Sequence, residues 1–187
     1  MNVVPTKLPG VLVIEPRVFR DERGYFLETY NLSTYTAGGL SVAFVQDNLS
    51  HSIRGVLRGL HYQHPSAQGK LVSVLDGEVF DVAVDIRPDS PTFRQWFGVF
   101  LSSENNRQCY VPAGYAHGFV VTSEVAKVHY KCTSLYQPKD EGSVVWDDPD
   151  LAIDWPVDTP ILSPKDKAAP RLRDVPAARL PRFAAEY

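Results

Sequence analysis

The chain has 187 residues, of which 44% are apolar and 22% charged; this composition is ordinary for a globular protein and argues against disorder. Its net charge of −3 lacks the basic excess of a nucleic-acid-binding protein, and no apolar run reaches the roughly 20 residues of a membrane span. The two cysteines lack a metal-binding spacing and are expected to be buried, while the N-terminus lacks an apolar signal segment. These features favour a cytoplasmic protein without nucleic-acid or membrane partners.

The 12 Gly and 15 Pro residues divide the chain into short segments rich in Val, Phe, Tyr and Thr, which fit the pleated surface of a strand. The predicted strands, in chain order, are 10–16, 24–30, 42–48, 55–63, 70–77, 78–87, 97–102, 109–112, 118–123 and 127–136. Short helices are expected at 31–38 and 176–183, and the serines that begin segment 102–107 could cap one helical turn. Many short strands separated by turns predict an all-β sandwich or barrel. We expect one domain over 1–187, with a segment from about Pro138 wrapping the barrel as irregular structure.

Segment 78–87 shows how one strand can serve two surfaces, because side chains alternate between the faces of a sheet. Phe80, Val82, Val84 and Ile86 share a face that we expect in the core. The opposite face carries Val79, Asp81, Ala83, Asp85 and Arg87. That face meets either solvent or a polar cavity, and a barrel favours the cavity. Asp81 and Asp85 are candidates for supporting a histidine.

An arginine and a histidine lie close together in the apolar segment 55–63. Burying Arg58 is costly unless its charge is paired, and a guanidinium binds phosphate through two parallel hydrogen bonds. Arg58 is therefore a candidate to bind an anionic group of a ligand. Strict alternation would place Arg58 and His61 on opposite faces, so we expect a bulge at Gly59 if both reach one ligand.

The stretch VPAGYAHGF, which contains His117, resembles the second half-motif of the cupin jelly rolls. Metal-binding cupins take further ligands from a His-x-His pair and a carboxylate in the first half-motif. Here the pair reads His61-Tyr62-Gln63, and Lys70 lies in the region of the carboxylate. A lysine beside a divalent cation is electrostatically unfavourable, so we expect no metal and no cofactor.

Seven stretches in order resemble one family of jelly-roll enzymes, the dTDP-4-dehydrorhamnose 3,5-epimerases. They cover most of residues 10–170 and are VFRDERGYFLETY (18–30), FVQDNLS (44–50), VLRGLHYQ (56–63), GKLVSVLDGEVFDVAVDIRPDSPTF (69–93), VPAGYAHGFVV (111–121), HYKCTSLYQPKDEGSVVWDDPDLAIDWP (129–156) and LSPKD (162–166). The resemblance implies an antiparallel jelly roll with a cavity between its sheets. It also implies a homodimer in which N-terminal strands cross to the partner and complete the partner's site.

The chemistry implied by the resemblance is inversion at C3 and C5 of dTDP-4-dehydro-6-deoxy-D-glucose, a step of dTDP-L-rhamnose biosynthesis. Both carbons flank the C4 ketone, so each inversion can pass through an enolate. The family pattern makes His61 the proton acceptor and Asp166 the carboxylate that fixes its tautomer, a pairing that suits a base near neutral pH. Lys70 matches the lysine near the C4 oxygen, and Tyr130 matches the proton donor on the opposite face.

The nucleotide half of the site also follows from the resemblance. Arg23 and Arg58 match the arginines that bind the diphosphate, and Tyr136 matches the tyrosine that stacks on thymine. The remaining matches to ligand positions are Glu28, Gln46, Asp47, Asn48, His117, Glu141 and Lys165.

Simpler structural roles remain open: Tyr130 and Tyr136 as ordinary strand aromatics, Arg23 in a solvated turn, and Asp166 as a helix cap. Three other functions also remain. The chain could be an epimerase acting at C3 or C5 alone, a ketoisomerase on the same fold, or a non-catalytic sugar-nucleotide-binding cupin. The last would explain Arg58 and Tyr136, but not the set of His61, Lys70, Tyr130 and Asp166.

Overall fold

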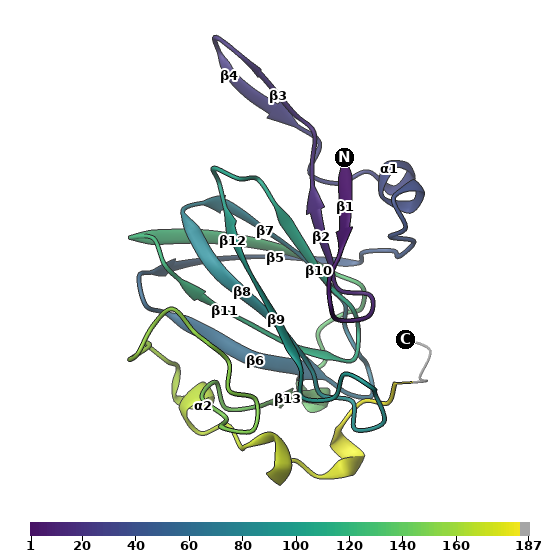
Figure 1. Cartoon of the computed structure of the whole chain (residues 1–187), viewed down its shortest axis with the longest axis vertical. Helices are drawn as coiled ribbons and strands as arrows, with labels where there is room; N and C mark the ends of the chain where they lie inside the picture. The colour runs from purple at the N-terminus through teal and green to yellow at the C-terminus, as the bar shows by residue number, and fades with distance from the viewer. Residues whose placement is uncertain (184–187) are drawn as a thin grey trace.

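In the computed structural model, which describes residues 1–183, two antiparallel sheets pack face to face (Figure 1). The first sheet contains, in spatial order, β1 (Asn2–Pro5), β2 (Leu12–Glu15), β10 (Gln108–Val111), β7 (Lys70–Asp76), β12 (Val125–Cys132) and β5 (Gln46–Ile53). The second contains β13 (Glu141–Ser143), β6 (Leu57–Gln63), β11 (Tyr115–Val121), β8 (Glu78–Asp85) and β9 (Trp96–Ser102). This arrangement confirms the predicted antiparallel jelly roll.

A separate hairpin, β3 (Val18–Asp21) and β4 (Gly24–Leu27), projects away from both sheets (Figure 1). The helical elements are α1 (Leu32–Ala37), α2 (Pro164–Lys167) and the 3-10 turns η1 (Pro138–Asp140), η2 (Leu172–Asp174) and η3 (Ala177–Arg179). None of the helices in residues 1–183 is both long and apolar enough to cross a bilayer.

The predicted strands are all present, although their ends differ by a few residues. The helix predictions are only partly confirmed. The strand predicted at 42–48 begins only at Gln46 and continues to Ile53. The helix at 31–38 is confirmed as α1, whose Asn31 side chain caps the first turn. Segment 102–107 forms the expected single turn, which the Ser102 side chain caps by accepting from the Asn105 amide at 3.0 Å, and no helix continues from it. Segment 176–183 contains only the turn η3.

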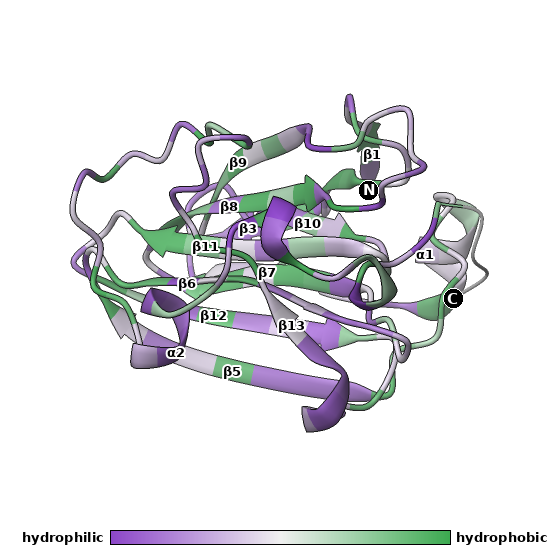
Figure 2. Cartoon of the chain, turned by 90° about the horizontal axis from the view of Figure 1, so that it is seen from below, coloured by the Kyte–Doolittle hydropathy of each residue, from purple (hydrophilic) through white to green (hydrophobic). Residues whose placement is uncertain are grey.

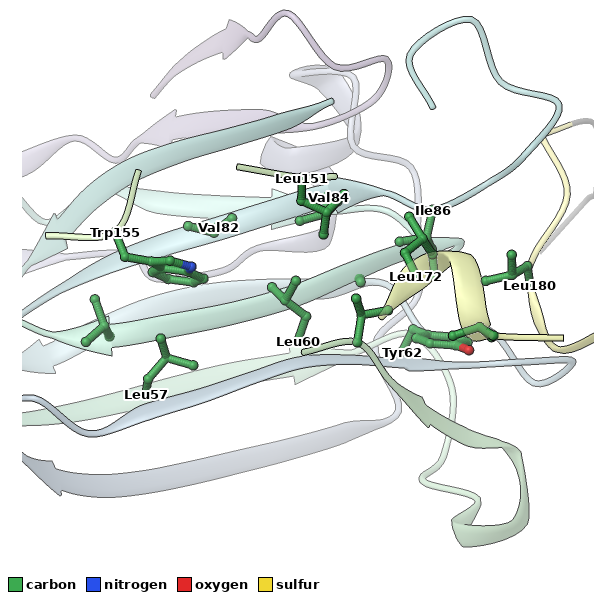
Figure 3. Close-up of a cluster of buried hydrophobic side chains, with 14 of the residues drawn as sticks. Leu57, Leu60, Tyr62, Val82, Val84, Ile86, Leu151, Trp155, Leu172 and Leu180 are labelled. Atoms are coloured by element: carbon green, nitrogen blue, oxygen red, sulfur yellow. The ribbon is translucent and has the colours of Figure 1, made fainter. Parts of the chain in front are cut away.

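The expected apolar face of β8 is buried, as predicted. Phe80, Val82, Val84 and Ile86 are at most 8% exposed and pack against the segment after β13, rather than against the other sheet. That segment contributes the side chains shown with them in Figure 3, namely Leu151, Trp155, Leu172 and Leu180. Burying one such side chain contributes about 1.5–3 kcal/mol. The segment after residue 143 therefore covers the outer face of the second sheet; residues 184–187, the end of the predicted domain, lie outside the described residues.

The space between the two sheets is apolar at one end and polar at the other. At the apolar end, Val79 and Ala83 of β8 pack against Val72 and Val128 of the facing sheet. Figure 2 shows apolar colouring along the central strands, whereas β5 at the sheet edge is mostly hydrophilic. On β5 the inward positions are polar, which leaves room for a ligand between the sheets at this edge.

Candidate active site

A cavity lies between the sheets near β5, β6 and β12. It consists of two adjoining spaces of about 400 and 280 Å³, and both are lined by His61, Lys70 and Tyr130. The larger space is also lined by Ser50, Val56, Leu57, Arg58, His117, Phe119, Ile161, Leu162, Ser163, Lys165 and Asp166. The smaller is also lined by Gln46, Asn48, Tyr62, Gln63, Gln68, Tyr136 and Glu141. The size of the whole cavity suits a small organic ligand.

A histidine and a carboxylate from distant parts of the chain meet in the cavity. His61 Nε2 lies 2.6 Å from Asp166 Oδ1. The Ser163 side chain caps α2 and accepts from the Asp166 amide at 3.1 Å, which fixes the position of the carboxylate. Burial alone would raise the pKa of Asp166, but its hydrogen bond with His61 and the charges nearby hold that pKa below its usual range. Asp166 therefore stays ionised and accepts from Nε2, which leaves Nδ1 of His61 as the basic nitrogen.

Strand β6 is irregular between Arg58 and His61, where the alternation of side chains along a strand predicted a bulge. Arg58 and His61 both line the larger space. The pairing of β6 with β11 shifts register between His117 and Phe119, which confirms the expected bulge. Gly59 lies at φ +129°, and a Cβ there would stand 2.6 Å from the Gly118 Cα, so the bend requires glycine.

A second histidine–carboxylate pair lies beside the first. His117 of β11 is the direct register partner of His61, and its Nε2 lies 2.7 Å from Asp81 Oδ2. Asp81 is 1% exposed, and its other oxygen has no hydrogen-bond partner within residues 1–183. The expectation that Asp81 supports a histidine is confirmed. The same expectation for Asp85 is wrong, because its carboxylate binds Arg87.

A lysine and a tyrosine face the two histidines. The Lys70 ammonium lies 5.9 Å from the centre of the Tyr130 ring, and Lys70 forms no ion pair within the described part of the chain. Burial lowers the pKa of Lys70, an effect opposed by Cys132, Asp81 and Glu141. Burial raises the pKa of Tyr130, with Arg58 opposing, so its hydroxyl stays protonated at neutral pH. The cavity thus offers a base, an acid and a nearby ammonium.

The smaller space ends in a linked polar group. The Tyr136 hydroxyl donates to Glu141 Oε2 at 2.9 Å, and Glu141 forms an ion pair with Lys165. The Gln46 side chain accepts from the Tyr136 amide at 2.8 Å and donates to Asn48 at 3.2 Å. Tyr136 lines the smaller space and is 49% exposed, so part of this aromatic side chain is accessible.

Three predicted ligand residues lie outside the cavity of their own chain. Arg23 is at the tip of the projecting hairpin and pairs with Asp21. Glu28 follows the hairpin and accepts from Asn31 at 3.0 Å. Asp47 faces away from the cavity, where its carboxylate binds Lys131.

Some lining residues were missed from the sequence. Ser163, three positions before Asp166, matches the Ser-x-x-Asp signature of a capped helix, which could have indicated α2. Ser50 lies two positions beyond Asn48 on the inward face of β5, as strand alternation could have indicated. Ile161 reaches the cavity through irregular chain, and no pattern indicated it. Within residues 1–183, no three His, Cys, Asp or Glu side chains are grouped to hold a metal ion.

A jelly roll with a histidine–carboxylate pair, an ammonium and a phenol around one cavity has the parts of an acid–base enzyme that acts beside a carbonyl group. The chain matches the family model described as dTDP-4-dehydrorhamnose 3,5-epimerase over residues 5–174. The chain belongs to this family of isomerases.

Known relatives agree with the match. A dTDP-4-dehydrorhamnose 3,5-epimerase from Salmonella typhimurium is 56% identical over 92% of this chain and 96% of its own length. The crystal structure of dTDP-6-deoxy-D-glucose-3,5-epimerase from Legionella pneumophila, in complex with dTDP-4-keto-L-rhamnose, is 54% identical, with a TM-score of 0.95 over 98% of this chain and 99% of that one. A 3'-monoepimerase from Streptomyces bikiniensis is 38% identical, with a TM-score of 0.85 over 92% of this chain and 88% of that one.

Proposed function

We propose that the chain converts dTDP-4-dehydro-6-deoxy-D-glucose to dTDP-4-dehydro-L-rhamnose, by removing and returning protons at C3 and C5. The observation that carries this proposal is the His61–Asp166 pair at 2.6 Å, in a cavity also lined by Lys70 and Tyr130. The Legionella pneumophila enzyme, whose fold this chain shares, was crystallised with a dTDP-4-keto sugar, which supports the same substrate class here. We also propose that the chain forms one domain and acts in the cytoplasm.

In this mechanism His61 is the base, and Asp166 keeps the ring oriented. Nδ1 of His61 accepts the proton from the carbon beside the ketone, and Asp166 stabilises the imidazolium that forms. The Lys70 ammonium stabilises the negative oxygen of the enolate, at a place where little water competes. The Tyr130 hydroxyl then delivers a proton to the opposite face of the carbon. Inversion requires that second face, because a base that returned its own proton would restore the starting configuration.

The nucleotide occupies the rest of the cavity. Arg58 binds the diphosphate, while thymine stacks on the exposed ring of Tyr136. Gln46, Asn48 and His117 contact the ligand from the cavity wall. The Glu141–Lys165 pair lies where the two spaces adjoin and contacts the ligand there.

We propose a homodimer in which the projecting hairpin enters the partner's site. Phe19, Tyr25 and Phe26 are 49%, 50% and 71% exposed, and a hairpin with this much exposed aromatic surface gains stability from a covering partner. In such a dimer Arg23 and Glu28 would act on the ligand of the neighbouring subunit. This arrangement accounts for their distance from the cavity of their own chain.

Deuterium incorporation tests the proposed reaction. The enzyme is incubated with dTDP-4-dehydro-6-deoxy-D-glucose in deuterated water, and label at C3 and C5 is followed by NMR. Label and inversion at both carbons are expected. Label at one carbon alone would identify a single-site epimerase, the activity named for the Streptomyces bikiniensis relative. Label at neither carbon, with dTDP still bound, would identify a binding protein and overturn the proposal.

The Tyr130→Phe variant tests whether Tyr130 is the acid and His61 the base. Removing the hydroxyl preserves the packing of the ring, so His61 should still form the enolate and return a solvent proton to the original face. Deuterium should then enter the substrate without inversion. Normal inversion in this variant would show that the acid is another group.

A further inference from the structure

The cavity contains an arginine whose charge has no acidic counterpart within residues 1–183. Within residues 1–183, Arg58 is the only arginine that lines the cavity, and it forms no ion pair with a carboxylate. By contrast, Arg23, Arg87 and Arg107 each bind an Asp or Glu. The positive charge of Arg58 is therefore available to an anionic ligand.

One contact nevertheless fixes the direction of this guanidinium. Arg58 Nε donates to the Ser52 hydroxyl at 3.1 Å. Ser52 belongs to β5 in the first sheet, Arg58 to β6 in the second, so the hydrogen bond crosses the opening between the sheets. Ser52 is 5% exposed and is held in the ladder opposite Ala126 of β12, which makes its oxygen a rigid anchor.

The chemistry of this contact suits recognition of two phosphate oxygens. A guanidinium has five N–H donors, and the Nε bond uses only one of them. The two terminal nitrogens have no hydrogen-bond partner in the described part of the chain, and their planar fork matches a phosphate with two parallel hydrogen bonds. Because Ser52 is neutral, it orients the guanidinium without cancelling the positive charge of Arg58. An Asp or Glu at this position would orient the guanidinium but would also neutralise its charge.

We infer that Ser52 is a positioning residue for Arg58, which holds the guanidinium in the orientation that binds the diphosphate of the nucleotide. This role rests on the proposed function, since it assumes a nucleoside diphosphate in the cavity. It adds a residue outside the Gln46–Asn48 stretch and explains why a polar side chain is buried at the end of β5.

The inference is tested by a double-mutant cycle on the full-length protein. The dTDP affinities of the wild type, Ser52→Ala, Arg58→Ala and the double variant are measured by calorimetry. A net hydrogen bond of this kind corresponds to an affinity change of about 3- to 10-fold. Ser52→Ala should therefore weaken dTDP by that factor in the wild-type background, and should cause no further loss when Arg58 is already absent.

Two controls separate positioning from a general structural effect. Thymidine, which has no phosphate, should bind Ser52→Ala and the wild type equally in an NMR titration. Ser52→Thr retains the hydroxyl and should keep dTDP affinity within about 2-fold, while Ser52→Cys, close to serine in size, provides a second test should Ser52→Ala unfold. In steady-state kinetics KM should rise with little change in kcat.

Each other outcome has a distinct meaning. Equal losses from Ser52→Ala in the wild-type and Arg58→Ala backgrounds, or equal losses for dTDP and thymidine, would overturn the positioning role. Unchanged dTDP affinity in both Ser52→Ala and Ser52→Cys would do the same. Unchanged affinity in Arg58→Ala would instead remove Arg58 from the proposed nucleotide site, a failure of the proposed function that the single variants reveal separately.

Discussion

Two groups of buried charge lie on the same face of β8, four residues apart, and they are built in opposite ways. At the end of the strand, Asp85 accepts two hydrogen bonds from Arg87, at 2.8 Å each, and others from Ser90 and Thr92. Asp81, buried behind His117, has one oxygen bound to that histidine and another with no hydrogen-bond partner in the described residues. The first group is satisfied by its own chain, whereas the second leaves one buried carboxylate oxygen unpaired within residues 1–183.

The same contrast holds for the cations of the two groups. Arg87 is stacked against Tyr115 and donates to its hydroxyl at 2.7 Å, whereas Lys70 forms no ion pair within residues 1–183. A buried charge is costly unless it is paired and hydrogen-bonded. The closed group around Asp85 therefore serves stability, whereas the open group around Asp81 bears a cost in stability.

The largest effect on the open group should come from His61→Asn. The variant should lose about 10²- to 10⁴-fold in kcat, because a general base contributes that range, while its melting temperature and dTDP affinity stay close to wild type. The measurement is deuterium exchange at C3 and C5 beside calorimetry with dTDP. Exchange at the wild-type rate would mean that another residue is the base.

Arg87→Met should break the closed group. It leaves the Asp85 carboxylate buried without its cation, which should cost about 3–5 kcal/mol in the free energy of unfolding, with little change in kcat below the melting temperature. The folded pKa of Asp85 is lowered by Arg87, Ser90 and Thr92 against burial, so the carboxylate stabilises the wild type above the unfolded pKa and loses this effect as pH falls.

The loss in Arg87→Met should accordingly shrink in acid, below a pH of about 4. Urea denaturation at several pH values checks both statements. A loss of kcat that exceeds the loss of folded protein would contradict the purely structural role of Asp85 and Arg87.

Lys70→Met should separate activity from stability. Its kcat should fall about 10²- to 10³-fold, as expected when one group that stabilises a developing oxyanion is removed. The folded pKa of Lys70 is lowered, so between that pKa and the unfolded value of about 10.4 the unfolded state binds more protons, and wild-type stability rises with pH.

A lowered folded pKa means that the charged ammonium destabilises the folded state, so Lys70→Met should be at least as stable as the wild type at neutral pH. Its stability should also lack the alkaline rise. Denaturation curves at pH 7 and above give both quantities, and a destabilised variant would indicate that the ammonium has a stabilising partner.

Asp81→Asn should have a smaller effect. The amide preserves the volume and can still accept from His117, but the charge is lost, so kcat/KM should fall by only about 10-fold, at the scale of one charge-assisted hydrogen bond. The melting temperature should hold or rise. A variant that fails to fold would place Asp81 in the scaffold, together with Asp85.

Exhaustive chelation should have no effect on activity. Lys70 and Gln63 lie in the region where a metal-binding relative of this fold would need ligands, and an ammonium disfavours a divalent cation. Loss of activity on chelation, with recovery on adding zinc, manganese or iron, would contradict this expectation.

The sequence predicted the strands well because β-branched and aromatic residues alternate between turn signals, as on β8. It predicted the bend at Gly59 because two polar side chains with wrong spacing had to share one ligand. It predicted that the segment from about Pro138 wraps the barrel, but not that this segment covers the outer face of β8, since tertiary contacts rather than local periodicity place Trp155 and Leu172 there.

The site residues differ in the same way: some were indicated by their own segment of sequence, and others are placed only by tertiary contacts. Arg58 and His61 were candidates from their own segment, because charge in an apolar strand needs an explanation. Asp166 entered only through family resemblance, since nothing local indicates a contact across 105 positions of sequence. The roles of Asp81 and Asp85 depended on which neighbours each meets, and only the three-dimensional structure distinguishes them.

The position of Asp166 has a consequence for how activity arises during synthesis. His61 and both sheets are made before the ribosome reaches α2, so a nascent chain can form both sheets while the base still lacks its carboxylate. The same late segment covers the outer apolar face of the second sheet. Completion of the fold and completion of the catalytic pair therefore depend on one stretch of polypeptide, and a chain released before Ser163 would lack both the capped carboxylate and part of its cover.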